Sequence, residues 1–360
     1  MIIAKQPPLG PFGWPTPAPF PFDRADTLLT RNGRTAIWLG LRALGLPPKA
    51  RILVPAWHCG SEIDAILAAG AIPVLYGLDQ DLMADPDQID RLLGQHKAAA
   101  VYVIHYFGQA QPLQALRHVA VRHGVPLIED LALGLYSTGP QHAPLGPEAD
   151  MAVFSLVKSV ATPDGGALWL KNLPNVALPK LVPPPLRASL AATKALLMNR
   201  NRQAIHDGLA DQDQLSQDAW DTHAGFATPE YPQSASKISK AILGLTDHRG
   251  LAQSRRSTYR ALQAAVPDLP HLRPLFAQLA AGACPAYFPL WVEQPEKLVE
   301  AMFQAGIEPV RFWRRFHPAF NLHDFPFEQA LKRHVIRLPL HRLVNDDAVD
   351  RIAKTCAACA

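Results

Sequence analysis

Short apolar runs alternate with helical segments along residues 35–129, and this alternation constrains the fold more than any other feature of the sequence. Buried strands are predicted for RILVP (51–55), AIPVLY (71–76), AAVYVI (99–104) and VPLIE (125–129). Helices are predicted for 35–44, 61–69 and 112–123, and Gly45, Gly70 and Gly124 stand where each of them ends. Strands that alternate with helices in this way predict a parallel sheet with helices on both faces.

The alternation suggests three unequal parts of the chain. Residues 1–30 are rich in proline, so we expect an extended strap on the body of the protein. Residues 31–235 are predicted to form a large α/β domain, with an irregular insertion at about 173–235 that contains the run LVPPPL and a helical stretch. From 236 to 360 the pattern resumes as helix, strand (286–292), helix, strand and a final helix (346–358), which predicts a smaller C-terminal α/β domain.

Composition and charge exclude several other classes of protein. With 48% hydrophobic and 18% charged residues, the chain has the balance of a globular protein rather than a disordered one. The formal charge is only +4 and the basic residues are scattered, which argues against nucleic-acid binding. No charge-free apolar run could span a bilayer, and the first residues lack the pattern of a signal peptide. The four cysteines form no metal-binding pattern, so we expect reduced thiols, no metal site and a cytoplasmic protein.

Three polar signals fall where a predicted strand ends or a predicted helix begins, the places where α/β sheets bind ligands. The segment RNGRTA opens a helix with Gly33, Arg34 and Thr35, whose free N–H groups suit a phosphate; the alternative is an ordinary helix cap. Asp130 follows the strand VPLIE and needs a cationic or hydrogen-bonding partner; the alternative is a helix cap or an internal salt bridge. Lys158 follows AVFSL, where a desolvated amine suits a Schiff base; the alternative is an ion-paired lysine.

Together, the three signals match the needs of one cofactor. Pyridoxal 5'-phosphate (PLP) requires a phosphate seat, an acid against its pyridinium nitrogen and an amine that forms a Schiff base. The Gly165-Gly166 pair would let the chain reverse close to such a cofactor. The order of these residues therefore predicts a PLP site built from Gly33, Asp130 and Lys158.

The segments that carry these residues also resemble a known family. RNGRTAIWLGLRALGL, VIHYFGQ, GVPLIEDLALGL and FSLVKSVATPDGGALWL resemble segments of the DegT-type sugar aminotransferases, which are fold-type I PLP enzymes. SASKISKAILGL and VIRLPLHRLVNDDAV resemble segments of the small domain of that family. The resemblance implies an aspartate-aminotransferase-like fold with a large doubly wound, mostly parallel sheet and a smaller C-terminal α/β domain. It also implies a homodimer with the active site near the subunit interface.

The resemblance assigns roles to individual residues. It gives Lys158 the Schiff base and Asp130 the pyridinium nitrogen. It gives the phosphate to Gly33, Arg34, Thr35 and Ser155. One side chain after Pro55 is implied to stack on the cofactor ring, and the candidates are Trp57, which has the largest face, His58 and Cys59.

Two further groups of residues have weaker assignments. His105 ends a strand, where it either contacts the cofactor or is a structural histidine. The run RFWRRFHP places Arg311 and Arg314 among aromatic residues, where they would attract a diphosphate or carboxylate substrate; the alternative is a solvated face with packing aromatics.

Departures from the family pattern indicate a divergent branch. Leu133 stands where the family usually has a glutamine, and the stretch between Ser155 and Lys158 is shorter than usual. The resemblance implies an aminotransferase that moves an amino group from glutamate to a nucleotide-linked keto sugar, for polysaccharide or secondary-metabolite biosynthesis. The alternatives are another fold-type I reaction (a lyase, dehydratase or racemase) and a non-catalytic regulatory descendant. Retention of Lys158 argues against the sugar dehydratases, which lack that lysine.

Overall fold

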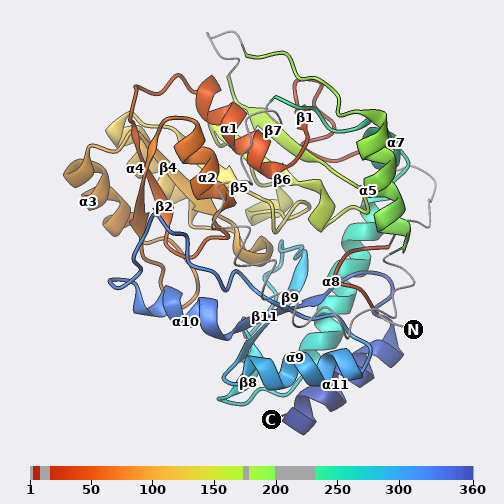
Figure 1. Cartoon of the computed structure of the whole chain (residues 1–360). Coiled ribbons are helices and arrows are strands. Elements are labelled where there is room, and N and C mark those ends of the chain that lie inside the picture. The colour runs from red at the N-terminus through yellow and green to blue at the C-terminus, as the bar shows by residue number, and fades with distance from the viewer. Residues whose placement is uncertain (1–2, 9–16, 173–177, 199–231, 360) are drawn as a thin grey trace.

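The described part of the chain contains one large and one small sheet (Figure 1). The computed structural model describes residues 3–8, 17–172, 178–198 and 232–359. The large sheet has the order β1-β7-β6-β5-β4-β2-β3, in which β3, β2, β4, β5 and β6 run parallel and β7 and β1 are added antiparallel. Its strands are β1 (Leu28–Thr30), β2 (Arg51–Pro55), β3 (Ile72–Tyr76), β4 (Ala100–Ile104), β5 (Leu127–Asp130), β6 (Met151–Ser155) and β7 (Gly166–Leu170). This arrangement confirms the predicted mostly parallel α/β fold.

Helices cover both faces of the large sheet, because successive residues of each strand point to opposite sides. Ile52 and Val54 of β2 pack toward one face, which is covered by α1 (Gly33–Ala43) and α2 (Ser61–Ala68). Leu53 packs toward the other face, which is covered by α3 (Pro86–His96) and α4 (Leu113–His123). On that second face α7 (Lys237–Gly244) packs beside β6 and β7.

The small sheet lies below the large one in Figure 1 and is entirely antiparallel, with the order β10-β11-β9-β8. Its strands are β8 (Leu272–Pro274), β9 (Tyr287–Val292), β10 (Val310–Arg311) and β11 (Val335–Pro339). Its core is shared with α8 (His248–Ala265), α9 (Pro295–Gln304) and α11 (Asp346–Cys359). A further helix, α10 (Pro326–His334), lies below the large sheet and to the left of the small one in Figure 1.

The described parts of the N-terminal segment contact both sheets. Ile3 forms a parallel β-bridge with Ile307 of the small domain. The ring of Phe20 packs edge-on against the rings of Phe154 and Trp169 of the large sheet. Of the predicted insertion, α5 (Leu186–Met198) is described, whereas 173–177 and 199–231 lie outside the described residues. The domain boundaries at 30 and 235 therefore stay predictions.

Two further observations concern membrane-spanning helices and the state of the cysteines. In the described ranges, no helix is both long and apolar enough to cross a membrane. All four cysteines are free, and Cys356 is buried in the core of the small sheet.

Candidate active site

Strand register brings the predicted site residues to the carboxyl edge of the large sheet. Asp130, the last residue of β5, pairs with Ile104 at the end of β4 and with Val153 in β6. Ser155, the last residue of β6, pairs with Gly166 at the start of β7. The short 3-10 helix η3 (Leu156–Lys158) follows directly, so the amine-bearing residue, the acid and the start of α1 share one edge.

The start of α1, which the sequence predicts to hold a phosphate, is made mostly of backbone. Asn32 caps the helix by accepting hydrogen bonds from the Thr35 amide at 2.9 Å and from the Thr35 hydroxyl at 3.1 Å. A Cβ atom built on Gly33 would lie 3.8 Å from the Cβ of Ser155, and one built on Gly166 would lie 2.6 Å from the amide nitrogen of Gly33. The first turn of α1 therefore lies directly against β6 and β7, and the Thr35 hydroxyl is already used by the cap.

A partly buried ion pair supports the start of α1. Asp164, which precedes the Gly165-Gly166 pair, is paired with Arg31 and accepts hydrogen bonds from the amide of Ser236 and the hydroxyl of Ser239. Arg34 is half-buried. The ion pair ties the start of α1, the turn before β7 and α7 into one unit.

Asp130 has the partners that a buried carboxylate requires. Its side chain is 3% exposed. The hydroxyl of Tyr102 donates to Oδ2 at 2.5 Å, and the amide of Ala132 donates to Oδ1 at 2.7 Å. Burial, followed by the charge of Asp130, raises the pKa of Tyr102, so the phenol keeps its proton and remains a donor. A carboxylate has about four acceptor positions, so Asp130 retains capacity for one further donor such as a ring N–H.

Lys158 is held in place through its backbone by Arg255, a residue that the sequence did not single out. Arg255 of α8 is 1% exposed. It donates to the carbonyls of Lys158 at 3.3 Å, Ser159 at 2.8 Å and Ala286 at 2.8 Å. Burial raises the pKa values of Cys59 and Glu62, and the charge of Lys158 acts on both in the opposite sense.

The three candidates for ring stacking lie in different surroundings. Trp57 has no exposed surface and stacks on Tyr106, with ring centroids 5.0 Å apart, inside an aromatic cluster with Trp313. His58 is buried near Lys332, and desolvation followed by that amine lowers its pKa. Cys59 is half-buried, and its thiol donates to Oε2 of Glu62 at 2.9 Å. The stacking role stays a prediction for these three residues.

The contacts of His105, Arg311 and Arg314 do not support the cofactor and substrate roles predicted for them. His105 has no exposed surface, its Nε2 is 3.1 Å from Glu129 and its Nδ1 accepts the amide of Gln111 at 3.2 Å. These contacts account for it as a structural histidine. Arg311 is paired with Glu296 in the small domain, which accounts for its charge, and Arg314 is half-buried. The cofactor and substrate roles of these residues stay predictions without geometric support.

Lys332 of α10 is a second buried amine beside the site, and no local pattern marks it in the sequence. Its Nζ donates to the carbonyl of His58 at 2.7 Å, of Arg315 at 3.0 Å and of Trp313 at 3.2 Å. Desolvation lowers its pKa to about 8. It therefore ties the loop that carries Cys59 to the segment that follows β10.

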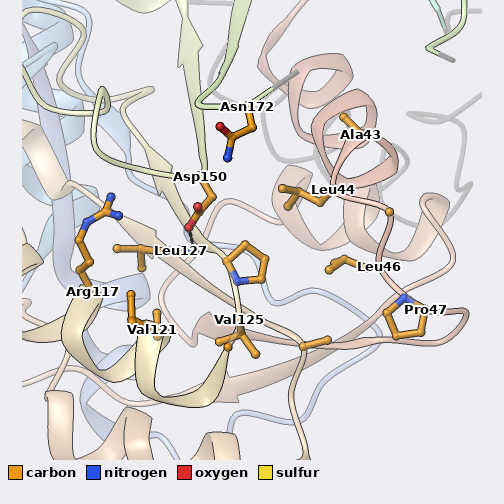
Figure 2. Close-up of a pocket in the computed structure, with 15 residues that line it drawn as sticks. Ala43, Leu44, Leu46, Pro47, Arg117, Val121, Val125, Leu127, Asp150 and Asn172 are labelled. Atoms are coloured by element: carbon orange, nitrogen blue, oxygen red, sulfur yellow. Dashed lines mark hydrogen bonds between the residues drawn. The ribbon is translucent and has the colours of Figure 1, made fainter. Parts of the chain in front are cut away.

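A separate groove of about 750 Å³ lies at the opposite edge of the sheet (Figure 2). It is lined by residues around the amino ends of β4 and β5, such as Ala99 and Leu127, and by the C-terminal ends of α1 and α4. Figure 2 shows Asp150 bonded to the backbone of Leu127, at 2.9 Å. Because ligands of α/β sheets bind at the carboxyl edge, this groove is not the predicted cofactor site.

The residues present fit PLP by the chemistry of their donors. The first turn of α1 offers free N–H groups to a phosphate, next to Ser155. Asp130 is a buried acceptor whose two partners keep it oriented. Lys158 supplies the amine at the same edge of the sheet. For the described residues, no group of three His, Cys, Asp or Glu side chains is arranged to hold a metal ion.

Comparison with known proteins gives matches of two kinds. The model of the DegT/DnrJ/EryC1/StrS aminotransferase family matches residues 24–176. GDP-perosamine synthase of Vibrio cholerae is 30% identical over 138 residues, 38% of this chain and 37% of that protein. The pleiotropic regulatory protein of Geobacillus stearothermophilus is 31% identical over 140 residues, again 38% and 37%. The matched region thus spans little more than a third of the length of these relatives.

Solved structures match over nearly the whole chain. The apo form of Spr1654, a putative sugar aminotransferase of Streptococcus pneumoniae, superposes with a TM-score of 0.71 and 18% identity, covering 99% of this chain and 97% of that one. At this identity the match establishes the fold, and that fold is the one the sequence predicted. The match to the DegT/DnrJ/EryC1/StrS aminotransferase family is confined to residues 24–176, less than half of the chain, and this is the segment that carries the predicted site residues.

Proposed function

We propose that the protein is a PLP-dependent aminotransferase. The observation that carries this proposal is the placement of Asp130, with its two hydrogen-bond donors, at the sheet edge that also holds Lys158 and the start of α1. Bound PLP would supply an electron sink for the electrons of a breaking Cα–H bond. The structural match to Spr1654, which is named as a putative sugar aminotransferase, supports the same conclusion.

The chain's own residues have separable tasks in this mechanism. The N–H groups at the start of α1 and the hydroxyl of Ser155 hold the phosphate. Asp130, oriented by Tyr102, would accept the hydrogen bond of the ring nitrogen and hold its proton there. Lys158 would hold the cofactor through its amine, and the same amine, when free, would serve as the base and acid that carries a proton at Nζ.

We further infer that glutamate is the amino donor and that a nucleotide-linked keto sugar is the acceptor. The name of GDP-perosamine synthase supports the nucleotide-linked sugar. A homodimer with its site near the interface and a cytoplasmic location belong to the same proposal. Sedimentation of the purified protein checks the dimer.

Reduction with borohydride tests the assignment of Lys158. The purified protein with PLP should be yellow, and reduction followed by peptide mapping should find the cofactor on the peptide that contains Lys158. Lys158→Ala should abolish both the label and turnover. A label on another lysine would contradict the site, and so would a variant that keeps both colour and turnover.

Two other functions remain as rivals. A lyase, dehydratase or racemase would use the same cofactor, but adding glutamate would not convert it to the pyridoxamine form, whereas an aminotransferase would shift its absorbance accordingly. A regulatory protein without catalysis is favoured by the named relative from Geobacillus stearothermophilus. Protein that stays colourless after PLP is added would support this second rival.

A further inference from the structure

The guanidinium of Arg255 joins the two sheets of the molecule with a different nitrogen for each. Nη2 donates to the carbonyls of Lys158 at 3.3 Å and of Ser159 at 2.8 Å, in the segment that follows β6 of the large sheet. Nη1 donates to the carbonyls of Pro285 at 3.4 Å and of Ala286 at 2.8 Å, directly before β9 of the small sheet. One side chain therefore fixes the backbone that carries the amine relative to the start of β9.

The start of β9 is also bonded to the loop that follows the acid. The amide of Ala286 donates to the carbonyl of Leu133 at 2.9 Å, and Leu133 lies three residues after Asp130. Ala286 thus donates toward the Asp130 loop with its N–H and accepts from Arg255 with its carbonyl. A path of hydrogen bonds runs from this loop through Ala286 and Arg255 to the carbonyl of Lys158.

Arg255 carries its charge at a position where a charge is costly. It is 1% exposed, and within the described part of the chain its Nε has no hydrogen-bond partner. Its two Nη atoms bond to backbone carbonyls. Burying a charge among carbonyl groups costs free energy that a well-packed apolar side chain would not. What the guanidinium adds is a rigid planar fork that can bond to two separate groups at once.

We propose that Arg255 is a positioning residue of the cofactor site, which sets the spacing between the Asp130 carboxylate and the Lys158 amine through the start of β9. This inference rests on the proposed function, because the ligand that needs this spacing is PLP. The ring nitrogen of PLP and the carbon that bears its aldehyde lie on opposite sides of one rigid ring. The acid and the amine must therefore be held a fixed distance apart. Arg255 does this through the backbone of Lys158, without touching the cofactor.

The affinities of cofactor-free protein for two ligands test the proposal. PLP reacts with the amine of Lys158, whereas 4-deoxypyridoxine 5'-phosphate has a methyl group in place of the aldehyde and cannot. Arg255→Met should lower the affinity for PLP about tenfold more than the affinity for the analogue, because the amine is displaced while the phosphate end is retained. If the ratio of the two affinities stays at its wild-type value, the proposal is overturned, whether both affinities fall or neither does.

Arg255→Lys separates the two-sided bond from the charge. Lysine keeps the positive charge but has a single nitrogen in place of the two that divide the carbonyls between them, and its chain is flexible. It should recover part of the melting temperature that Arg255→Met loses, yet leave the ratio of PLP affinity to analogue affinity lowered. A lysine variant with the wild-type ratio would show that charge alone suffices, which contradicts the proposal. This variant decides the question by itself if Arg255→Met does not fold.

Arg256 supplies a matched control, one residue further along α8. It donates to the carbonyls of Ala281 and Ala283, so its bonds lie on the β9 side. Arg256→Met should lower the melting temperature and leave the affinity ratio unchanged. A ratio lowered as in Arg255→Met would mean that any lost contact of α8 has this effect, and would overturn a specific role for Arg255.

The wild-type protein separates failure of this inference from failure of the proposed function. If borohydride links PLP to no lysine of the wild type, the proposed function fails as well. If Lys158 is labelled in the wild type but Arg255→Met keeps the wild-type affinity ratio, only the inference about Arg255 is removed.

Discussion

The phosphate end and the ring end of the proposed site are built in different ways. At the phosphate end, backbone approaches backbone: Gly166 of β7 lies against Gly33, and Ser155 adjoins both. At the ring end, side chains from separate elements converge, and Arg255 and Lys332 of the C-terminal part hold their loops in place. The phosphate end should therefore be disrupted by substitutions that add side-chain volume. The ring end should be disrupted by substitutions that remove or add a charge.

Gly166→Ala should have the largest effect. The new Cβ would lie 2.6 Å from the amide nitrogen of Gly33 and equally close to the carbonyl of Asn32, and neither backbone group can move as a flexible side chain would. We expect a loss of about 3 kcal/mol in the free energy of unfolding and no measurable PLP binding. Urea denaturation and PLP titration measure the two effects.

A second glycine provides the control for Gly166. Gly94 lies within α3, and a Cβ built on it would meet nothing within 4 Å. Gly94→Ala should stabilise the protein by up to about 1 kcal/mol and leave PLP affinity unchanged. If both alanine variants behaved alike, close backbone approach would not be what defines the phosphate end.

Lys332→Met tests the ring end and should have the second-largest effect. It removes a buried donor from the carbonyls of His58, Trp313 and Arg315, and buried acceptors without partners are costly. We expect a loss of about 2 kcal/mol in the free energy of unfolding near neutral pH, with weaker PLP binding because the loop with Cys59 is released. Thermal unfolding and PLP titration are the measurements.

The pH dependence of that loss has a definite sign. Folding lowers the pKa of Lys332 from 10.5 to about 8, so between these pH values the unfolded chain binds more protons. Wild-type stability should therefore rise with pH relative to Lys332→Met across that range. The control is Lys171→Met, which removes an exposed pair with Glu148 and should cost under about 0.5 kcal/mol at any pH. A pH-independent difference for Lys332 would mean that its amine is not desolvated.

The contrast between the phosphate end and the ring end also explains which features the sequence could predict. Strands β2, β3 and β4 were predicted almost to the residue, because apolar runs and terminal glycines are local signals. The phosphate end was predicted from such signals as well. By contrast, α3 was missed: Pro86 and the polar run that follows form only a narrow apolar stripe, of which Ile89 and Leu93 are buried.

The supporting residues of the ring end had no local signal. Arg255 and Lys332 lie on amphipathic helices, where arginine and lysine normally face solvent, and only the tertiary structure buries them. The contacts of the Trp57 ring with Phe312 and Trp313, which follow β10, likewise had no signal in the sequence. Contacts between distant segments, rather than residue type, decided these positions.

Ser155→Ala should have the smallest effect, and it can separate the two predicted phosphate hydroxyls. Ser155 adjoins Gly33 across the seat, so its loss should weaken PLP binding about tenfold and leave the melting temperature of cofactor-free protein unchanged. Thr35→Val should do the reverse, because the Thr35 hydroxyl donates to the cap residue Asn32; it should lower stability by about 1 kcal/mol with little change in affinity. If Thr35→Val weakened binding as much as Ser155→Ala, the helix cap would open to admit the phosphate, and backbone alone would not define that end.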